Sequence, residues 1–304
     1  MRTPMLAALC LLAAAAGALV IALPVEAQPG DGTGEGTTVG FRGDPATLAP
    51  IGRDTDLPPG TRWEDGALVV ERRNLRLEDV YVRGGVRFDR RGSLSIRDSI
   101  VEGGYGATHV VLGTAKGATL DVRRSTLRWR PDREPGVDTS AAIQISNLVR
   151  IVAIENDISG TTDGIQVAGD RTRIVGNRIH DLALVGTFPE SSHNDGIQVF
   201  AGRDVLIRDN HIEIGFDDVH QNAAVFLQPG DGDSITAPRI VRNVLEGGRF
   251  TLRLEQPTTT DAVVVDNRFH RSTANQADAY ALMGATIAAW EGNVDEAGQP
   301  VPRP

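Results

Sequence analysis

The sequence predicts an all-β protein built as a β-solenoid, a stack of coils that each contain short parallel strands. Three observations predict this fold. A short motif recurs along the chain, no segment has the periodicity of an amphipathic helix, and aromatic residues make up only 5% of the 304 residues. Many valines, isoleucines and leucines with few aromatics suit thin stacked layers better than one bulky core.

The first residues of the chain predict an export signal. Arg2 supplies a positive charge, residues 5–25 are uncharged and mostly apolar, and Val25-Glu26-Ala27 fits a cleavage site. We therefore expect residues 1–27 to be the signal peptide of a secreted protein, either extracellular or periplasmic, with no stable membrane insertion after cleavage. A retained membrane anchor is the alternative, because about 20 apolar residues can span a bilayer.

Composition divides and constrains the remaining chain. Residues 28–62 are rich in Gly, Pro, Thr and Asp and predict a loose lead-in, whereas 294–304 predict a disordered tail. The solenoid is expected over 63–293, as a monomer. Cys10 lies inside the export signal, so the mature chain has no thiolate for a disulfide or a metal. The net charge of −9 disfavours nucleic acid as a partner.

The recurring motif consists of an apolar residue, two variable residues, Asn or Ser, one variable residue and a second apolar residue. Its copies follow one another at intervals of about 20 to 33 residues, a period that indicates a β-solenoid. Asn side chains stacked at the strand spacing of about 4.8 Å can form an amide ladder, and Asn tolerates the left-handed conformation of a sharp bend. The Asn or Ser positions are Ser99, Ser125, Asn156, Asn177, Asn210, Asn243, Asn267 and Asn293.

A second series of positions marks one strand in each coil. Apolar residues flank each position on both sides, so alternation with a period of two points the flanks inward and the central residue outward. The outer face of this sheet is therefore expected to carry a row of glutamines followed by Phe and Arg, suited to sugar hydroxyls or to a structural amide ladder. The positions are Val111, Gln144, Gln166, Gln198, Phe226, Arg253 and Ala281.

Insertions concentrate immediately before this strand. The longest are residues 128–140, 182–194 and 216–222, whereas the segments after the strand have steadier lengths. Loops at one edge of successive coils build a wall beside the exposed strand face. We therefore expect a groove along the solenoid axis that binds an extended polysaccharide.

The motif and its period resemble the right-handed parallel β-helix of the pectate lyase and polygalacturonase superfamily, over about residues 64–293. The resemblance implies a right-handed parallel β-helix with loops inserted along one edge of one sheet. It also implies an activity on polysaccharides. Related β-helix lyases use Arg or Lys as a base, often with calcium, so calcium is possible here, although no cofactor is certain.

Two aspartates occupy the same place on adjacent coils, as Asp163-Gly164-Ile165 and Asp195-Gly196-Ile197. Strict alternation points both inward, but a bend at the start of a strand breaks that alternation. If both face outward, their repulsion raises the pKa of one carboxyl or attracts a cation. The alternative is that both simply form Asp-Gly turns.

Acids and histidines gather around the second of these aspartates. Adjacent acids and a histidine can supply a general acid or base. Polygalacturonases carry Asn-Thr-Asp-Gly and, about one coil later, Gly-Asp-Asp; this chain has His-Asn-Asp-Gly at 193–196 and Phe-Asp-Asp at 216–218, matching in the acids and Gly196. The family's Gly-His-Gly and Arg-x-Lys segments have no counterpart, which departs from that hydrolase mechanism.

Arg253 carries the lyase interpretation. Lys116 is the only lysine, so a lysine base is disfavoured. Arg253 lies in the outward row and can act as a base in a desolvated site or clamp a uronate carboxylate, and its alternative is an ion pair with Glu255 on the same face.

We expect the chain to cleave an acidic, uronate-containing polysaccharide by β-elimination. A polygalacturonase-like hydrolase and a non-catalytic glycan-binding or adhesive solenoid are the alternatives. The candidate catalytic residues are His193, Asp195, Asp218, His220 and Arg253. The candidate substrate-binding residues are Gln144, Asp163, Gln166, Asn194, Gln198, Asp217, Phe226 and Glu255.

Overall fold

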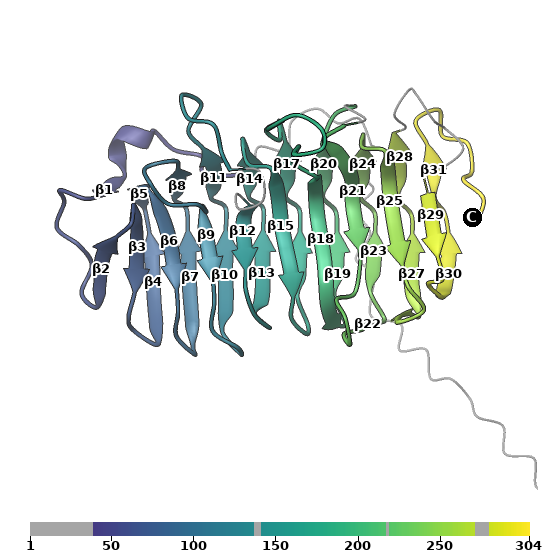
Figure 1. The fold of residues 1–304 in the computed structure, drawn as a ribbon, viewed down its shortest axis with the longest axis horizontal. Coiled ribbons are helices and arrows are strands. Elements are labelled where there is room, and N and C mark those ends of the chain that lie inside the picture. The colour runs from purple at the N-terminus through teal and green to yellow at the C-terminus, as the bar shows by residue number, and fades with distance from the viewer. Residues whose placement is uncertain (1–38, 137–140, 217–218, 271–279) are drawn as a thin grey trace, which may run out of the picture. The chain divides into compact units, whose positions relative to one another are not determined.

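The structure, a computed structural model, describes residues 39–136, 141–216, 219–270 and 280–304. The expected signal peptide lies outside these residues. The fold is nearly all β, and its strands stack in sequence order into a parallel β-helix (Figure 1). A single 3-10 turn, η1 (Pro45–Thr47), precedes the strands. Among the described residues, no helix has the length and hydropathy needed to cross a membrane.

Three parallel sheets form the solenoid, and a typical coil contributes one strand to each. Sheet A contains β1 (Ala49–Ile51), β5 (Val80–Arg83), β8 (Ile100–Gly103), β11 (Thr126–Trp129), β14 (Asp157–Ser159), β17 (Arg178–His180), β20 (His211–Glu213), β24 (Val244–Glu246), β28 (Arg268–His270) and β31 (Val294–Asp295). Sheet C contains β4 (Asn74–Glu78), β7 (Ser93–Arg97), β10 (Thr119–Arg123), β13 (Arg150–Ile154), β16 (Arg173–Val175), β19 (Leu206–Arg208), β23 (Arg239–Val241), β27 (Ala262–Val265) and β30 (Ile287–Glu291).

Sheet B carries the outward-facing row that the sequence predicts. Its main strands are β2 (Thr61–Glu64), β3 (Ala67–Val70), β6 (Gly85–Phe88), β9 (Val111–Gly113), β12 (Ala141–Ile145), β15 (Asp163–Ala168), β18 (Asn194–Arg203), β21 (Gln221–Leu227), β25 (Phe250–Glu255) and β29 (Tyr280–Met283). The short strand β22 (Ile235–Thr236) pairs with the C-terminal end of β18, and β26 (Thr259–Thr260) pairs with β22. β2 runs antiparallel to β3, and the other pairs in these sheets are parallel.

The core is a stack of aliphatic side chains in register from coil to coil. Ile165 pairs with Ile197, Ile197 with Val225 and Val225 with Leu252, and each is at most 1% exposed. At about 25 cal/mol per Å² of buried apolar surface, such a continuous stack supplies the main stabilising term of the fold. The register confirms inward flanks around Gln166, Gln198, Phe226 and Arg253. In the coil of β9, however, Leu112 and not Val111 pairs with Gln144, and Val111 is buried.

An asparagine ladder runs along the coils, as predicted. Each Asn side-chain oxygen accepts from both the backbone N–H and the Nδ2 of the Asn one coil earlier, as Asn177 does from Asn156 at 3.0 and 2.9 Å. The same pattern continues from Asn177 to Asn293. In the two earlier coils, Ser99 and Ser125 take the place of Asn. Because these side chains are buried, the ladder satisfies polar groups that water cannot reach.

The left-handed residue of the bend is the one before each ladder position, and not the Asn itself. Asp98, Arg124, Glu155 and Asp209 have φ values of 46°, 45°, 55° and 56°. The prediction that Asn adopts this conformation is therefore wrong. What the ladder requires of Asn is its side-chain amide, which supplies two N–H donors and an oxygen that accepts two hydrogen bonds.

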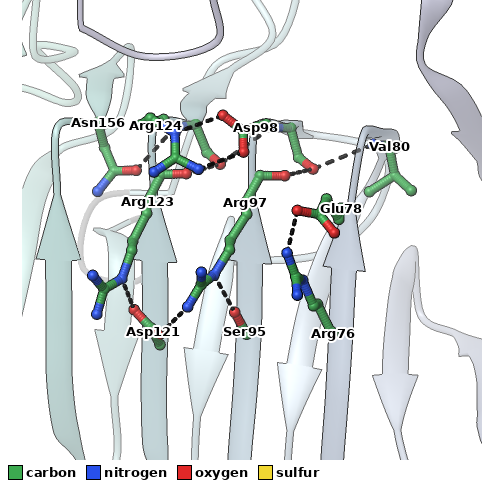
Figure 2. Close-up of polar contacts among 12 residues, drawn as sticks. Arg76, Glu78, Val80, Ser95, Arg97, Asp98, Asp121, Arg123, Arg124 and Asn156 are labelled. Carbon is green, nitrogen blue, oxygen red and sulfur yellow. Dashed lines mark hydrogen bonds and ion pairs between the residues drawn. The ribbon is translucent and has the colours of Figure 1, made fainter.

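Ion pairs cover the outer face of sheet C and the adjoining bends (Figure 2). Asp121 lies between Arg97 at 3.0 Å and Arg123 at 2.6 Å, and Arg124 binds Asp98 on the preceding coil through both its Nε and Nη2. This hydrogen bonding by Arg124 lowers the pKa of Asp98. Sheet C is thus a charged face on which most carboxylates already have an arginine partner.

Both ends of the solenoid are more ordered than the sequence predicts. In the expected lead-in, β1 pairs with β5 of sheet A. In the expected disordered tail, β31 pairs with β28, Val301 is 5% exposed, and the indole of Trp290 donates to the Val301 carbonyl at 2.9 Å. The tail was predicted from composition alone. Composition does not reveal that Val301 packs in the last layer of the core.

Candidate functional site

A cavity of about 850 Å³ opens at the N-terminal ends of β15, β18, β21 and β25. All three long insertions connect sheet A to sheet B, so they lie on this edge as predicted. The loops before β18 and β21 form its rim. Eight of the predicted site residues line it together: Asp163, Gln166, His193, Asp195, Gln198, His220, Phe226 and Arg253.

Asp163 and Asp195 meet at the floor of this cavity. The backbone N–H of Asp195 donates to Asp163 Oδ1 at 2.9 Å, and Gln166 Nε2 donates to Asp163 Oδ2 at 3.2 Å. Asp195 Oδ1 in turn accepts from Asn222 Nδ2 at 2.9 Å and from the Ala223 N–H at 3.0 Å. Each carboxylate is therefore fixed by the coil that follows it.

An irregularity in strand pairing places a further amide beside Asp195. Asn194 pairs with Gln221, but Asp195 pairs with Ala223, which leaves Asn222 as an extra residue on β21. Such a bulge re-aims neighbouring side chains. It brings the Asn222 amide against the Asp195 carboxylate.

Asp195 is only 2% exposed, and its surroundings favour the protonated form. Burial raises the pKa of Asp195 well above its ordinary value, and the neighbouring charge of Asp163 raises it further. Hydrogen bonds from Asn222 and Ala223 oppose this shift without overcoming it. The site thus holds a carboxylic acid that keeps its proton at higher pH than a free aspartate does.

Asp195 should make the protein less stable as pH rises. An unfolded Asp has a pKa of about 3.9, and the folded value is higher. Between these values the folded chain binds a proton that the unfolded chain has lost, so the free energy of unfolding falls as pH rises through the folded pKa. Asp195→Asn removes this dependence, so its stability relative to the wild-type chain should increase from about pH 4 upward.

Urea unfolding at a series of pH values measures this difference. The matched control is Asp261→Asn, because Asp261 is exposed and its φ of 57° suits Asn as well. A difference between Asp195→Asn and the wild-type chain that stays constant across the series would contradict a raised pKa of Asp195.

Arg253 is held between two aromatic rings. Its guanidinium carbon lies 4.8 Å from the centroid of Phe226 and 4.7 Å from that of Phe250. Its Nη1 donates to Asn222 Oδ1 at 3.1 Å, and it forms an ion pair with Glu255. Asn222 therefore links Arg253 to Asp195, and a guanidinium of fixed orientation faces the same cavity as the two carboxyl groups.

The two histidines belong to the loops at the rim. His193 is exposed, immediately before β18. His220 donates from Nε2 to the Gly186 carbonyl at 3.1 Å, and its own carbonyl accepts from the Asn194 N–H at 2.6 Å. His220 thus ties the loop before β18 to the loop before β21, and both imidazoles border the cavity.

Several predicted residues are placed elsewhere. Asn194 is 0% exposed and donates to the Ala183 carbonyl at 2.8 Å, so its side chain holds the loop and does not face the cavity. Glu255 lies behind Arg253 and accepts from Gln228 at 3.1 Å. Gln144 lies on β12, in an earlier coil outside the cavity. Asp217 and Asp218 fall outside the described residues.

The cavity also contains residues that the sequence did not single out. Asn222 and Phe250 contact the central groups, and Phe188 on the rim is 80% exposed. Phe250 pairs with Ala223, and Ala223 with Asp195, so extending the alignment three residues before Arg253 would have found it. Asn222 has no such signal, because the bulge moves it out of the aligned column.

The comparisons with protein-family models, with curated proteins and with solved structures give no match for this chain. Its chemistry must therefore be argued from the cavity itself. Among the described residues, no group of three or more His, Cys, Asp or Glu side chains is arranged to hold a metal ion. In the part of the chain that the structure describes, the ionisable groups that line the cavity are two neighbouring carboxyl groups, two imidazoles and the guanidinium groups of Arg249 and Arg253.

Proposed function

We propose that this chain cleaves glycosidic bonds in an acidic, uronate-containing polysaccharide, by hydrolysis, at the cavity over Asp163 and Asp195. The observation that carries the proposal is the buried Asp195, whose pKa is raised, beside a second carboxyl group in a different environment. Two carboxyl groups whose pKa values are driven apart are the usual acid and base of glycoside hydrolysis.

In this mechanism Asp195 donates its proton to the glycosidic oxygen as the bond from that oxygen to the anomeric carbon breaks. A water molecule adds its hydroxyl group to the anomeric carbon, and the carboxylate of Asp163 takes the remaining proton. Burial raises the pKa of Asp195 and so favours the protonated form that an acid needs. Asp163 is less buried than Asp195, and Gln166 Nε2 donates to its Oδ2 at 3.2 Å, which fixes a carboxylate that can act as the base.

Arg253 supports an acidic substrate. A planar guanidinium recognises a carboxylate through two parallel hydrogen bonds, and the rings of Phe226 and Phe250 fix its plane. Gln166 and Gln198 pair in adjacent strands and offer amide donors and acceptors to sugar hydroxyls. The exposed ring of Phe188 adds an apolar face at the rim against which a sugar ring can stack.

Hydrolysis is favoured here over the β-elimination that the sequence favours, because the ion pair with Glu255 leaves Arg253 unsuited to act as a base. β-Elimination is the second candidate, since His193 and His220 border the same cavity as Arg253. An imidazole can remove the C5 proton while the guanidinium neutralises the uronate carboxylate. The repeat-based resemblance to the pectate lyase and polygalacturonase superfamily supports either reaction, and the apolar segment at 5–25 supports export.

A panel of polysaccharides tests the proposal. Polygalacturonate, alginate and other uronans should be shortened by the purified chain, with new reducing ends and no absorbance from unsaturated products. Reducing ends accompanied by that absorbance would favour elimination. If no glycan is shortened although uronans bind, the chain is a non-catalytic glycan-binding solenoid and the proposal fails.

Removing the charge of Arg253 should weaken substrate binding more than turnover. Arg253→Met alone leaves Glu255 buried without its ion-pair partner, so it should be combined with Glu255→Gln. For this double variant we expect KM for a uronan to rise about tenfold while kcat changes little, as for an interaction made equally in the ground and transition states. Steady-state kinetics measure both constants.

Glu255→Gln alone is the matched control, since it keeps the guanidinium and the hydrogen-bonding partner of Gln228. Its KM should stay within about twofold of the wild-type value. A fall in kcat with unchanged KM for the double variant would instead assign Arg253 to the chemical step.

A further inference from the structure

Sheet B has a second edge, opposite the cavity, where its strands turn into sheet C. Six consecutive turns, from the β3–β4 turn to the β18–β19 turn, carry at least one Arg or Lys each, in the turn or directly beside it. All of these side chains are exposed. They define the cationic edge, which comprises Arg72, Arg73, Arg90, Arg91, Lys116, Arg150, Arg171 and Arg203.

Three of the four acids in these turns are paired with arginines outside the edge, and the fourth, Asp170, forms no ion pair among the described residues. Glu71 is paired with Arg62 at 2.6 Å, Asp89 with Arg87 at 2.9 Å, and Asp204 with Arg173 at 2.6 Å. Each of these partners lies on a strand and outside the cationic edge. Within the described part of the chain, none of the eight cations of the edge forms an ion pair with an acid.

This arrangement contrasts with the outer face of sheet C around β4, β7 and β10, where arginines and carboxylates are in contact (Figure 2). It also contrasts with the net charge of the chain, which is −9. On the edge, the cations repeat once per coil, at the strand spacing, so six coils give a row about 24 Å long. A row of exposed cations with this period matches a linear polyanion lying parallel to the solenoid axis.

The centre of the row is hollowed. Lys116, Arg150, Arg171 and Arg203 surround a cavity of about 590 Å³. Its lining also includes Asp170, whose Oδ1 accepts the Arg203 N–H at 2.8 Å, and the exposed Asp233. A lining of four cations and two carboxylates suits a ligand with both anionic groups and hydroxyl donors.

We propose that the cationic edge is a second binding site for a carboxylated linear polysaccharide, separate from the cavity over Asp195. The nature of the polymer rests on the proposed function, whereas its place rests on the row of cations. Uronate chains carry carboxylates, which the Arg and Lys side chains can bind. They also carry hydroxyl groups, which can donate hydrogen bonds to Asp170 and Asp233. A DNA backbone offers no hydroxyl donors to those two acids, and the acidic chain as a whole repels it.

Binding is measured on an Asp195→Asn background, so that cleavage does not consume the probe. The probes are polygalacturonate, neutral dextran and duplex DNA, in retardation gels and by calorimetry. In the double variant Arg171→Asn and Arg203→Ser, we expect the affinity for polygalacturonate to fall about fivefold, and adding Arg90→Ser and Arg91→Ser should extend the loss to about twentyfold. Asn is chosen at position 171 because φ there is 54°. Affinity should also fall with salt.

The matched control is Arg83→Ser with Arg178→Ser, which removes two exposed arginines from sheet A. It should bind polygalacturonate as the Asp195→Asn chain does, and dextran should bind to neither. Unchanged affinity in the edge variants, or an equal loss in the control, overturns the inference. Duplex DNA that binds the edge as tightly as polygalacturonate does would make nucleic acid the partner and overturn it too.

The same data separate this inference from the proposed function. A wild-type chain that cleaves nothing, yet binds polygalacturonate through Arg171 and Arg203, would refute the cleavage proposal and leave the edge site standing. An active chain whose affinity for polygalacturonate is unchanged by the edge substitutions would refute the edge site and leave the cleavage proposal standing.

Discussion

Asp195→Asn should lower kcat on a uronan by about 10²- to 10⁴-fold, the contribution usual for a positioned general acid, with little change in KM. Asn occupies the same volume and still accepts from Asn222 Nδ2 and the Ala223 N–H, so the variant keeps its local geometry. What it loses is the proton that burial holds on the carboxyl group. Initial rates of reducing-end release measure the effect.

The control again is Asp261→Asn, which removes an exposed carboxylate distant in sequence from the cavity and should leave kcat unchanged within about twofold. Thermal unfolding of each variant verifies that the chain is folded. Activity of the wild-type chain should fall as pH rises above the raised pKa of Asp195, because the ionised carboxylate cannot donate. Near wild-type kcat in Asp195→Asn would exclude Asp195 as the acid.

Asn210→Ala should reduce the free energy of unfolding by about 4 kcal/mol. The Asn210 oxygen accepts from the N–H and the Nδ2 of Asn177, both at 2.9 Å. Its own Nδ2 donates to the Ile174 carbonyl at 3.0 Å and to Asn243 Oδ1 at 2.9 Å. Removing the amide leaves these buried groups of neighbouring coils without partners, and each such group costs about 1–3 kcal/mol.

Asn210→Ser should cost less, about 2 kcal/mol, since Ser125 already fills a rung of the ladder by accepting the Ser99 N–H at 3.2 Å. Asn147→Ala serves as the control: Asn147 is exposed and outside the ladder, so its loss should stay within about 0.5 kcal/mol. Urea denaturation of the three variants gives the order. Equal stability of Asn210→Ala and Asn147→Ala would contradict a structural ladder.

The fold could be predicted because its repeating interactions leave repeating residues. The ladder position must bond to the coils on both sides, and in this chain it is always Asn or Ser. These positions can therefore be recognised in the sequence. The left-handed position before them is occupied by Asp, Arg, Glu and Gly, and this variety hides it. The outward-facing residue of β9 was predicted wrongly because Val110, Val111 and Leu112 form an unbroken apolar run. Such a run does not show which residues face inward.

The site was predictable in part, for reasons that lie in the strand pairing. Asp163 and Asp195 precede identical Gly-Ile-Gln-Val runs, so their alignment on adjacent coils followed from the sequence. The approach of Asn222 to Asp195 follows from one extra residue on β21, which strand pairing reveals and composition does not. The aromatic faces around Arg253 come from two strands: Phe226 belongs to the predicted row, whereas Phe250 lies three residues before Arg253 on β25, outside that row.

The closed ends of the solenoid have a consequence for its behaviour in concentrated solution. A stack of parallel strands is a template at both terminal coils, where unpaired backbone groups invite another chain to continue the sheet. At one end β2 covers β3 by antiparallel pairing, and at the other the Val301 N–H donates back to the Asn293 carbonyl at 2.9 Å. Because these two segments cover part of the terminal coils, we expect them to hinder edge-to-edge pairing with a second chain.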